Sequence, residues 1–267
     1  MSKASPSRRF FCLGAISVGL FIISALGWSI SNGQAVQHQI EKAKIFREAY
    51  PLISETDLYC SIYAHKGELP DMRITAAEKG AEKILLSDSD VFFVNKGKDD
   101  GLEMGQVFLI VEIGQSLGEH GWLATKQGRG HVIFLEANRA VARVEKACGR
   151  VMVGNYLVPF EEKESLLGKD LGYEAFSEED KGAMGTIIYL QSDWNQIGSG
   201  SWGIINIGET SGVQVGQQMT IYKQIREDLP RVGIGNLIVI DTQPDTATIK
   251  VLSCSDAVRI GYQVQAK

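Results

Sequence analysis

Paired acids set between glycines are the first residues of this chain whose types and spacing suggest chemistry. Residues 95–106, NKGKDDGLEMGQ, place Asp99 beside Asp100 between glycines, so the acids could serve acid-base catalysis, or the glycine-rich backbone could cradle a phosphate. Residues 206–217, NIGETSGVQVGQ, repeat the glycine spacing, with a Thr-Ser pair in place of the two acids. Because the glycines keep their positions and the acids do not, the pattern indicates a turn that the backbone requires.

The repeated glycines are therefore predicted to be structural rather than catalytic. Glycine reaches positive φ without a Cβ penalty, which suits tight turns between short strands. The predicted turn glycines are Gly97, Gly101, Gly105 and Gly154 in the first copy and Gly208, Gly212, Gly216 and Gly261 in the second.

Other patterns that could support chemistry are weak. The histidines, His38, His65, His120 and His131, stand far apart without metal-ligand spacing. Residues 198–203, GSGSWG, match G-x-G-x-x-G, but a strand is expected to follow them, so a pyrophosphate would lack its helix N-terminus. We therefore predict no catalytic residue, no metal ligand, no cofactor and no enzymatic activity.

The cysteines favour an oxidising compartment. Cys12 lies in an apolar run near the N-terminus, which leaves Cys60, Cys148 and Cys254 for pairing. A disulfide between Cys60 and Cys148 would tie the entering chain to its own domain, and three buried thiols are the alternative.

The N-terminus carries the chain's clearest membrane signal. Residues Phe10–Ile30 hold no charge and follow Arg8 and Arg9. At about 1.5 Å per residue such a helix crosses a bilayer core of about 30 Å. An uncleaved anchor is the favoured interpretation, with a signal peptide cleaved near Ala35 as the alternative. The two arginines fit a positive-inside flank or a twin-arginine export signal.

Between the apolar run and residue 58, the sequence predicts a helix over residues 36–50, which Pro51 ends. This helix could be a dimerisation stalk, but at barely two heptads a solvated spacer is favoured.

Beyond residue 58 the apolar residues alternate, as in short antiparallel strands with one buried face. Residues 91–110 align without a gap on 202–221. A second alignment places Ala142 on Ala247, and a third places 151–154 on 258–261. The strands expected in the first copy cover 72–77, 91–95, 106–113, 130–136, 140–146 and 156–159.

The predicted fold is mainly β, with two tandem small antiparallel β-barrel domains after an N-terminal membrane helix. The predicted parts are a membrane anchor or signal segment over 1–35, a juxtamembrane helix and linker over 36–57, a first barrel over 58–160, an acidic linker over 161–182 and a second barrel over 183–267.

Two variable segments are candidates for partner contacts. Residues 161–182 hold eight acids and three lysines, which predicts a solvated linker or, as an alternative, a docking site for a basic partner. The loop 114–130 differs most between the copies, and its Trp122 is a candidate contact residue. The chain's net charge of -5, with no long basic run after the first dozen residues, argues against a nucleic-acid partner.

Several stretches resemble known families. YCSIYA, RITAAEKGAEKILLSDSDVFFVNKG, GLEMGQVFLIV and ACGRVMVGNYLVPF resemble the paired C-terminal β-domains of bacterial envelope proteins that often carry a LysM peptidoglycan-binding module. Such domains are similar to the C-terminal domains of the flagellar outer-ring assembly protein and of a pilus secretin-associated protein. The resemblance covers residues 58–265, without a LysM module. The glycine ladder over 95–105 also resembles the rod-shape scaffold family MreC, whose long coiled coil is missing here.

Both resemblances imply envelope scaffolding without catalysis. We expect a single-pass protein of the bacterial inner membrane, with its bulk in the periplasm, acting within a pilus, secretin, flagellar or cell-wall machine. Peptidoglycan is a further candidate partner. The alternative function is an accessory subunit of a membrane-bound enzyme or electron-transfer complex.

Overall fold

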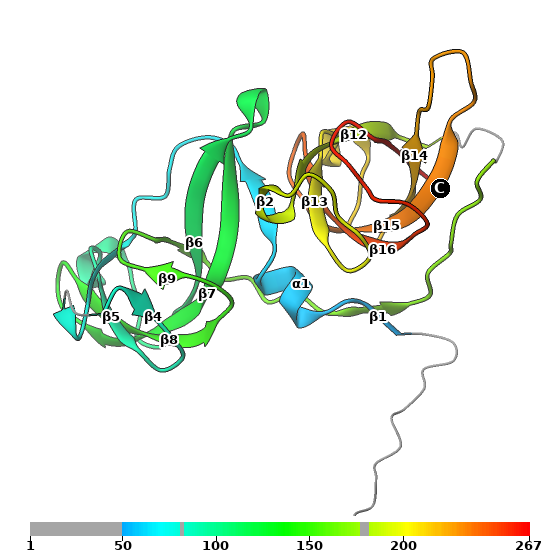
Figure 1. The fold of residues 1–267 in the computed structure, drawn as a ribbon. Coiled ribbons are helices and arrows are strands. Elements are labelled where there is room, and N and C mark those ends of the chain that lie inside the picture. The colour runs from blue at the N-terminus through cyan, green and yellow to red at the C-terminus, as the bar shows by residue number, and fades with distance from the viewer. Residues whose placement is uncertain (1–49, 81–82, 177–181) are drawn as a thin grey trace, which may run out of the picture. The chain divides into compact units, whose positions relative to one another are not determined.

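The computed structural model describes residues 50–80, 83–176 and 182–267 (Figure 1). The predicted span Phe10–Ile30 and the predicted helix up to residue 49 lie outside these ranges, as do Cys12 and His38. Within the described ranges, no helix has the length and apolar character needed to cross a bilayer. All described residues belong to one compact unit.

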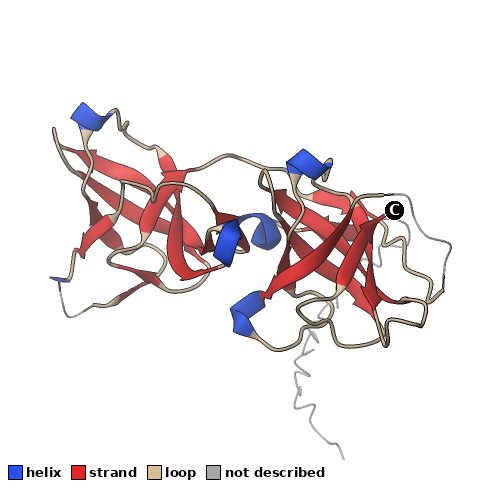
Figure 2. Ribbon diagram, turned by 90° about the horizontal axis from the view of Figure 1, so that it is seen from above, coloured by secondary structure: helices blue, strands red, loops and turns tan. Residues whose placement is uncertain are grey.

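The mainly β architecture predicted from the alternating pattern is confirmed, and the second half of the chain forms a closed antiparallel barrel (Figure 2). Ala247, Ile249 and Val251 point into the barrel core, while Thr248 and Lys250 between them point outward. In order around the barrel, the strands are β12 (Met184–Leu190), β13 (Trp202–Ile205), β16 (Ala247–Cys254), β15 (Val232–Thr242), β14 (Gln218–Lys223) and β17 (Gln263–Ala266).

The first half forms a seven-stranded sheet with the same strand order. Its two end strands meet through a single bridge between Arg73 and Tyr156, where the barrel has a continuous ladder between β12 and β17. In order across the sheet, the strands are β3 (Ile74–Ala77), β5 (Val91–Val94), β8 (Ala140–Ala147), β7 (Trp122–Leu135), β6 (Val107–Ser116) and β10 (Tyr156–Pro159), and β2 (Ile62–His65) also pairs with β7.

Short elements complete the described chain. They are β1 (Tyr50–Ile53), which pairs with β11 (Leu166–Gly168); β4 (Leu85–Leu86), which pairs with β9 (Val151–Met152); helix α1 (Glu55–Tyr59); and the 3-10 turns Lys98–Asp100, Gly118–His120, Gln191–Asp193 and Glu209–Ser211.

Strand pairing and equivalent hydrogen bonds match residues of the sheet to residues of the barrel. The Asn95 side chain accepts a 2.7 Å hydrogen bond from the Arg73 amide, and the Asn206 side chain accepts one of 2.7 Å from the Thr186 amide. The ends of the ladders correspond as well, because the Gly154 amide donates to Ile74 O at 2.9 Å and the Gly261 amide to Ile187 O at 2.8 Å.

The second of the three sequence alignments is corrected by this register. Val94 pairs with Ala140, and its counterpart Ile205 pairs with Ala247. Ala140, and not Ala142, therefore corresponds to Ala247, a shift of two residues from the sequence alignment. A shift of two leaves the inward and outward positions unchanged, so the alternating pattern alone could not detect it.

The described part of the predicted acidic linker, residues 161–176, is mostly exposed, and a few of its groups bond to the rest of the fold. Residues 166–168 form β11, which pairs with β1. The Leu171 amide donates to the Gln218 side chain at 2.9 Å, and the Gly233 amide donates to Ala175 O at 2.9 Å. Charge counting misses this arrangement because these contacts use backbone groups, which any residue can supply.

Candidate functional site

The entering segment, residues 50–65, contacts both the sheet and the barrel. It comprises β1, α1 and β2. Helix α1 begins at Ser54, whose hydroxyl accepts from the Asp57 amide at 3.3 Å while the Asp57 carboxylate accepts from the Ser54 amide at 2.8 Å. This reciprocal cap satisfies two of the amides that a helix start leaves free and fixes where the Asp57 side chain lies.

Asp57 ties α1 to the barrel. Its carboxylate accepts hydrogen bonds from the Trp202 indole at 2.9 Å and from the Lys250 ammonium at 2.7 Å. Burial alone would raise the pKa of Asp57, but the hydrogen bonds from Lys250, Ser54 and Trp202 outweigh it and lower that pKa below its ordinary value. The carboxylate is therefore ionised at neutral pH and engaged in a structural ion pair.

Apolar contacts cover the same outer face of the barrel. Ile62 of β2 and Leu123 of β7 share a buried cluster with Ile204 and Tyr189 of the barrel. The Thr248 hydroxyl on the neighbouring barrel strand donates to Ile62 O at 2.6 Å. The cluster excludes water around this hydrogen bond, so β2 is held by both apolar burial and a satisfied polar contact.

An ion triad, in which Lys126 and Asp241 are buried and Lys163 is exposed, forms a second link between the sheet and the barrel. Lys126 of β7 donates to the Asp241 carboxylate of β15 at 2.8 Å, and Lys163 donates to the same carboxylate at 2.9 Å. Lys126 also donates to Leu58 O of α1 at 2.8 Å. Lys126, which lies in the sheet, therefore bonds to both the barrel and α1 and holds these three parts together.

Burial and charge oppose each other within this triad. Burial would raise the pKa of Asp241, but the neighbouring Lys126 and Lys163 ammonium groups lower it overall. Burial lowers the pKa of Lys126, with Asp241 acting in the opposite direction. Burial also raises the pKa of the nearby Tyr63 hydroxyl to about 12, with the Asp241 charge adding to the effect.

Two cavities adjoin these links. One of about 410 Å³ is bordered by Tyr63, the ion triad and Glu209. The other, of about 560 Å³, is bordered by the two half-cystines, Glu112, Gln127 and Arg150. Its polar groups bond to one another, since Gln127 donates to Glu112 at 2.6 Å and Arg150 pairs with Glu112 at 3.2 Å.

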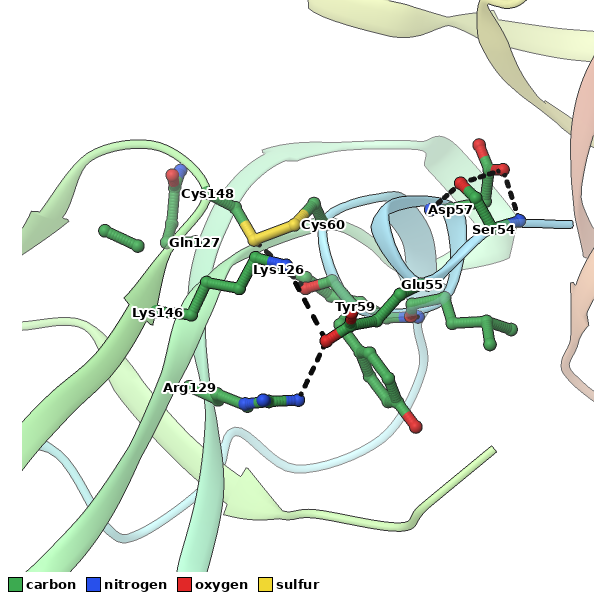
Figure 3. Close-up of a disulfide and its surroundings, with 12 residues drawn as sticks. Ser54, Glu55, Asp57, Tyr59, Cys60, Lys126, Gln127, Arg129, Lys146 and Cys148 are labelled. Atoms are coloured by element: carbon green, nitrogen blue, oxygen red, sulfur yellow. Dashed lines mark hydrogen bonds and ion pairs between the residues drawn. A yellow bond between two sulfur atoms is a disulfide. The ribbon is translucent and has the colours of Figure 1, made fainter. Parts of the chain in front are cut away.

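The structure joins Cys60, which follows α1, to Cys148, which follows β8, by a disulfide (Figure 3). Glu55 at the start of α1 reinforces this link, because Arg129 and Lys146 of the sheet approach its carboxylate at 3.2 and 3.6 Å. Cys254, on the last residue of β16, is a free thiol. The disulfide thus fastens α1 to the sheet, while Asp57 fastens it to the barrel.

The turn glycines serve two different backbone needs. Gly97 has extended backbone, but a Cβ there would lie 2.4 Å from the Arg139 nitrogen, and one on Gly208 would lie 2.1 Å from Gln243 O. The remaining six predicted glycines have positive φ, between 77° and 96°. They are Gly101, Gly105, Gly154, Gly212, Gly216 and Gly261.

Trp122 begins β7, at the tip of the hairpin with β6, and pairs with His65 of β2. Its side chain is 46% exposed. His65 bonds to Glu68 O at 2.9 Å, His120 lies in the hairpin loop, and His131 pairs with Arg143 across the sheet. Among the described residues, no three His, Cys, Asp or Glu side chains gather as metal ligands.

No protein-family model matches the sequence, and no curated protein matches it significantly.

Sequence reasoning missed Asp57, Lys126 and Asp241, the charged residues that link the sheet and the barrel. A signal existed for the first, because Ser54 and Asp57 have the spacing of a helix cap. Lys126 and Asp241 gave no local signal, since each occupies an outward strand position that normally faces water.

Proposed function

We propose that this protein is a non-catalytic scaffold or assembly subunit of the bacterial cell envelope, anchored by Phe10–Ile30 and acting through protein contacts. In this proposal, residues 58–160 and 183–267 are tandem barrel domains of common origin. The matching strand order and the matching asparagine caps, Asn95 and Asn206, support common origin.

The observation that carries the proposal is that the entering segment, residues 50–65, is fixed to both the sheet and the barrel. It connects the predicted anchor to the described unit and is fastened twice: by Asp57, in the middle of its short helix, to Trp202 and Lys250, and by Cys60, after that helix, to Cys148. The charged groups most buried in this region, Asp57, Lys126 and Asp241, pair with one another or with fixed neighbours. These ion pairs hold the sheet and the barrel in a fixed relative position, and a scaffold requires such a fixed arrangement of its binding surfaces.

The disulfide supports a location outside the cytoplasm. Disulfides persist in oxidising compartments such as the periplasm and are rare in the reducing cytosol. Together with the apolar run after Arg8 and Arg9, this favours an inner-membrane anchor with residues 36–267 in the periplasm.

The test of location is protease access in spheroplasts that express the full chain with a C-terminal tag. We expect external protease to remove the tag while a cytoplasmic marker survives. Survival of the tag in intact spheroplasts, with loss after lysis, would contradict the proposed topology.

The test of function is co-purification of the full chain after extraction in a mild detergent. We expect a stoichiometric pilus, secretin, flagellar or cell-wall component, and the complex should persist when Asp99 and Asp100 are both replaced by alanine. Recovery of a membrane-bound enzyme or electron-transfer complex instead would support the accessory-subunit alternative and contradict the scaffold assignment. Sedimentation of the chain with purified peptidoglycan tests direct wall contact separately.

A further inference from the structure

Within one chain, the sheet presents an edge that covers an outer face of the barrel. The edge consists of β2 and the tip of the β6–β7 hairpin, with Ile62 and Leu123 as its buried apolar residues. The covered face carries Ile204, Thr248 and Asp241, which lie side by side because Thr248 pairs with both of the others.

The register that relates the two halves places an equivalent face on the sheet. Phe93, Val141 and Phe134 occupy the positions of Ile204, Thr248 and Asp241, and they form the same cross-strand row, since Val141 pairs with both phenylalanines. Phe93 is 36% exposed and Phe134 is 54% exposed, whereas Ile204 is fully buried. The sheet therefore carries an apolar copy of the covered barrel face, which the described residues leave partly exposed.

The barrel likewise carries a copy of the covering edge. The Lys126 amide donates to Ser61 O at 3.0 Å, and its counterpart, the Gly233 amide, donates to Ala175 O at 2.9 Å. The residue after Ala175 is Phe176, which thus corresponds to Ile62, the residue after Ser61. Ile62 is 4% exposed against the barrel, and Phe176 is 71% exposed.

The hairpin tips agree with this assignment. The ladder of β14 with β15 has its irregularity between Ile221 and Tyr222, as the ladder of β6 with β7 has it between Ile110 and Val111. The ladder of β14 with β15 ends at Lys223 and Val232, and Leu229, which is 39% exposed, lies in the hairpin loop between these two strands.

We propose that the chain assembles head to tail, with the barrel edge of one copy, marked by Phe176 and Leu229, packed on the sheet face Phe93, Val141 and Phe134 of a second copy. This contact would repeat between chains the packing that already exists within one chain. In the proposed contact, Gly233 takes the position of Lys126 and Phe134 that of Asp241. Both are uncharged, so the contact buries no unpaired charge at that point. Because edge and face are different surfaces, the contact is heterologous and continues from copy to copy.

The inference builds on the proposed scaffold function, yet the two can fail separately. A chain that stays monomeric and still co-purifies with an envelope complex removes self-assembly and leaves the scaffold proposal standing. A chain that self-assembles but recovers no envelope component supports self-assembly and contradicts the scaffold proposal.

Cross-linking of the full chain in detergent tests the predicted neighbours. One tagged chain carries Phe176→Cys and a differently tagged chain carries Phe93→Cys, both with Cys12→Ser and Cys254→Ser, and a short bismaleimide is added to the mixture. We expect a mixed dimer, and none above background when Ile260→Cys, at an exposed barrel position, replaces Phe93→Cys. Cross-links between two Phe93→Cys chains without mixed dimers would show a face-to-face contact and overturn the proposal.

Complementation tests the head-to-tail geometry. Phe134→Glu should weaken self-association measured by sedimentation velocity about tenfold or more, the effect of a charge at a central apolar contact, and Phe176→Glu should do the same. Each variant alone should be monomeric, while an equal mixture should form dimers, because one chain keeps an intact edge and the other an intact face. Ile260→Glu should associate like the parent chain.

Circular dichroism and thermal melting show whether Phe134→Glu and Phe176→Glu fold. If one of them does not fold, the self-association of the other variant tests the proposed contact. Three results overturn the proposal: a parent chain that is monomeric at all concentrations, folded variants that associate like the parent, and a mixture that stays monomeric. The first result would agree with residues 1–49 of the same chain covering the sheet face.

Discussion

The carboxylate of Asp57 accepts a 2.9 Å hydrogen bond from the indole of Trp202, 145 residues away in sequence. The same carboxylate pairs with Lys250, the residue that lies opposite Trp202 in the barrel ladder. A helix of five residues, too short to be stable alone, is thereby held against two adjacent barrel strands.

Asp57→Ala should lower the free energy of unfolding by about 3 kcal/mol, because it leaves the half-buried Lys250 ammonium without its partner. Chemical denaturation of the full chain in detergent measures the change. Asp245→Ala is the matched control, since it removes the exposed pair with Lys66 and should cost less than about 1 kcal/mol. Equal losses for the two variants would contradict the structural role of Asp57.

Acidification should destabilise the fold through Asp57 and Asp241. Both have a lowered pKa in the folded protein, so their stabilising contribution is fully present above the unfolded pKa of about 4 and is lost as pH falls through the folded values. Denaturation between pH 7 and pH 2 should show this loss below about pH 4. Asp241→Asn should be less stable at pH 7 and should show a shallower decline in acid, and an unchanged slope would exclude Asp241 as a contributor.

Removal of the disulfide should also destabilise the chain. Cys60→Ser combined with Cys148→Ser opens a link between residues separated by 88 positions and should cost about 2–5 kcal/mol. Intact mass with and without reductant reports the disulfide itself, and denaturation reports the cost. Cys254→Ser should change stability by less than about 0.5 kcal/mol, because that thiol is free. Alkylation of all thiols without reduction would contradict the pairing.

Alanine at the two kinds of turn glycine should give different losses. At Gly208 the new Cβ would lie 2.1 Å from Gln243 O and 2.6 Å from Thr246 O, so backbone must move, and we expect a loss of about 3 kcal/mol or more. At Gly212 no atom lies within 4 Å, so only the positive φ of 78° is penalised, at about 1 kcal/mol. Gly198→Ala, which has open space and no positive φ, should be nearly neutral. Thermal midpoints rank the three, and a larger loss at Gly212 than at Gly208 would contradict this assignment.

The strands were predictable from the sequence where one face is buried and the other meets water. Ile249 and Val251 alternate with polar residues, and that alternation marks both the strand and its inner face. The duplicated glycines also predicted the turns, because both copies keep the glycine positions while the residues between the glycines change.

The correct alignment of the copies and the links between them were not predictable. Placing Ala142 on Ala247 preserved the alternation, and only the pairing of Ala140 with Val94 reveals the two-residue shift. Lys126 and Lys250 read as solvent-facing strand residues, because their partners lie more than 100 positions away in the chain. Burial of an outward face depends on which part of the fold covers it, and local sequence does not carry that information.

The disulfide between Cys60 and Cys148 has a mechanical consequence for a chain held at its N-terminus. Tension that enters at Tyr50 reaches Cys60 and passes directly through the sulfur bridge to Cys148, so residues 61–147 carry no load. At about 3.5 Å per residue, roughly 300 Å of contour length is thereby withheld from extension. Under reducing conditions that length becomes available once the sheet unfolds, so the chain could then extend further under load.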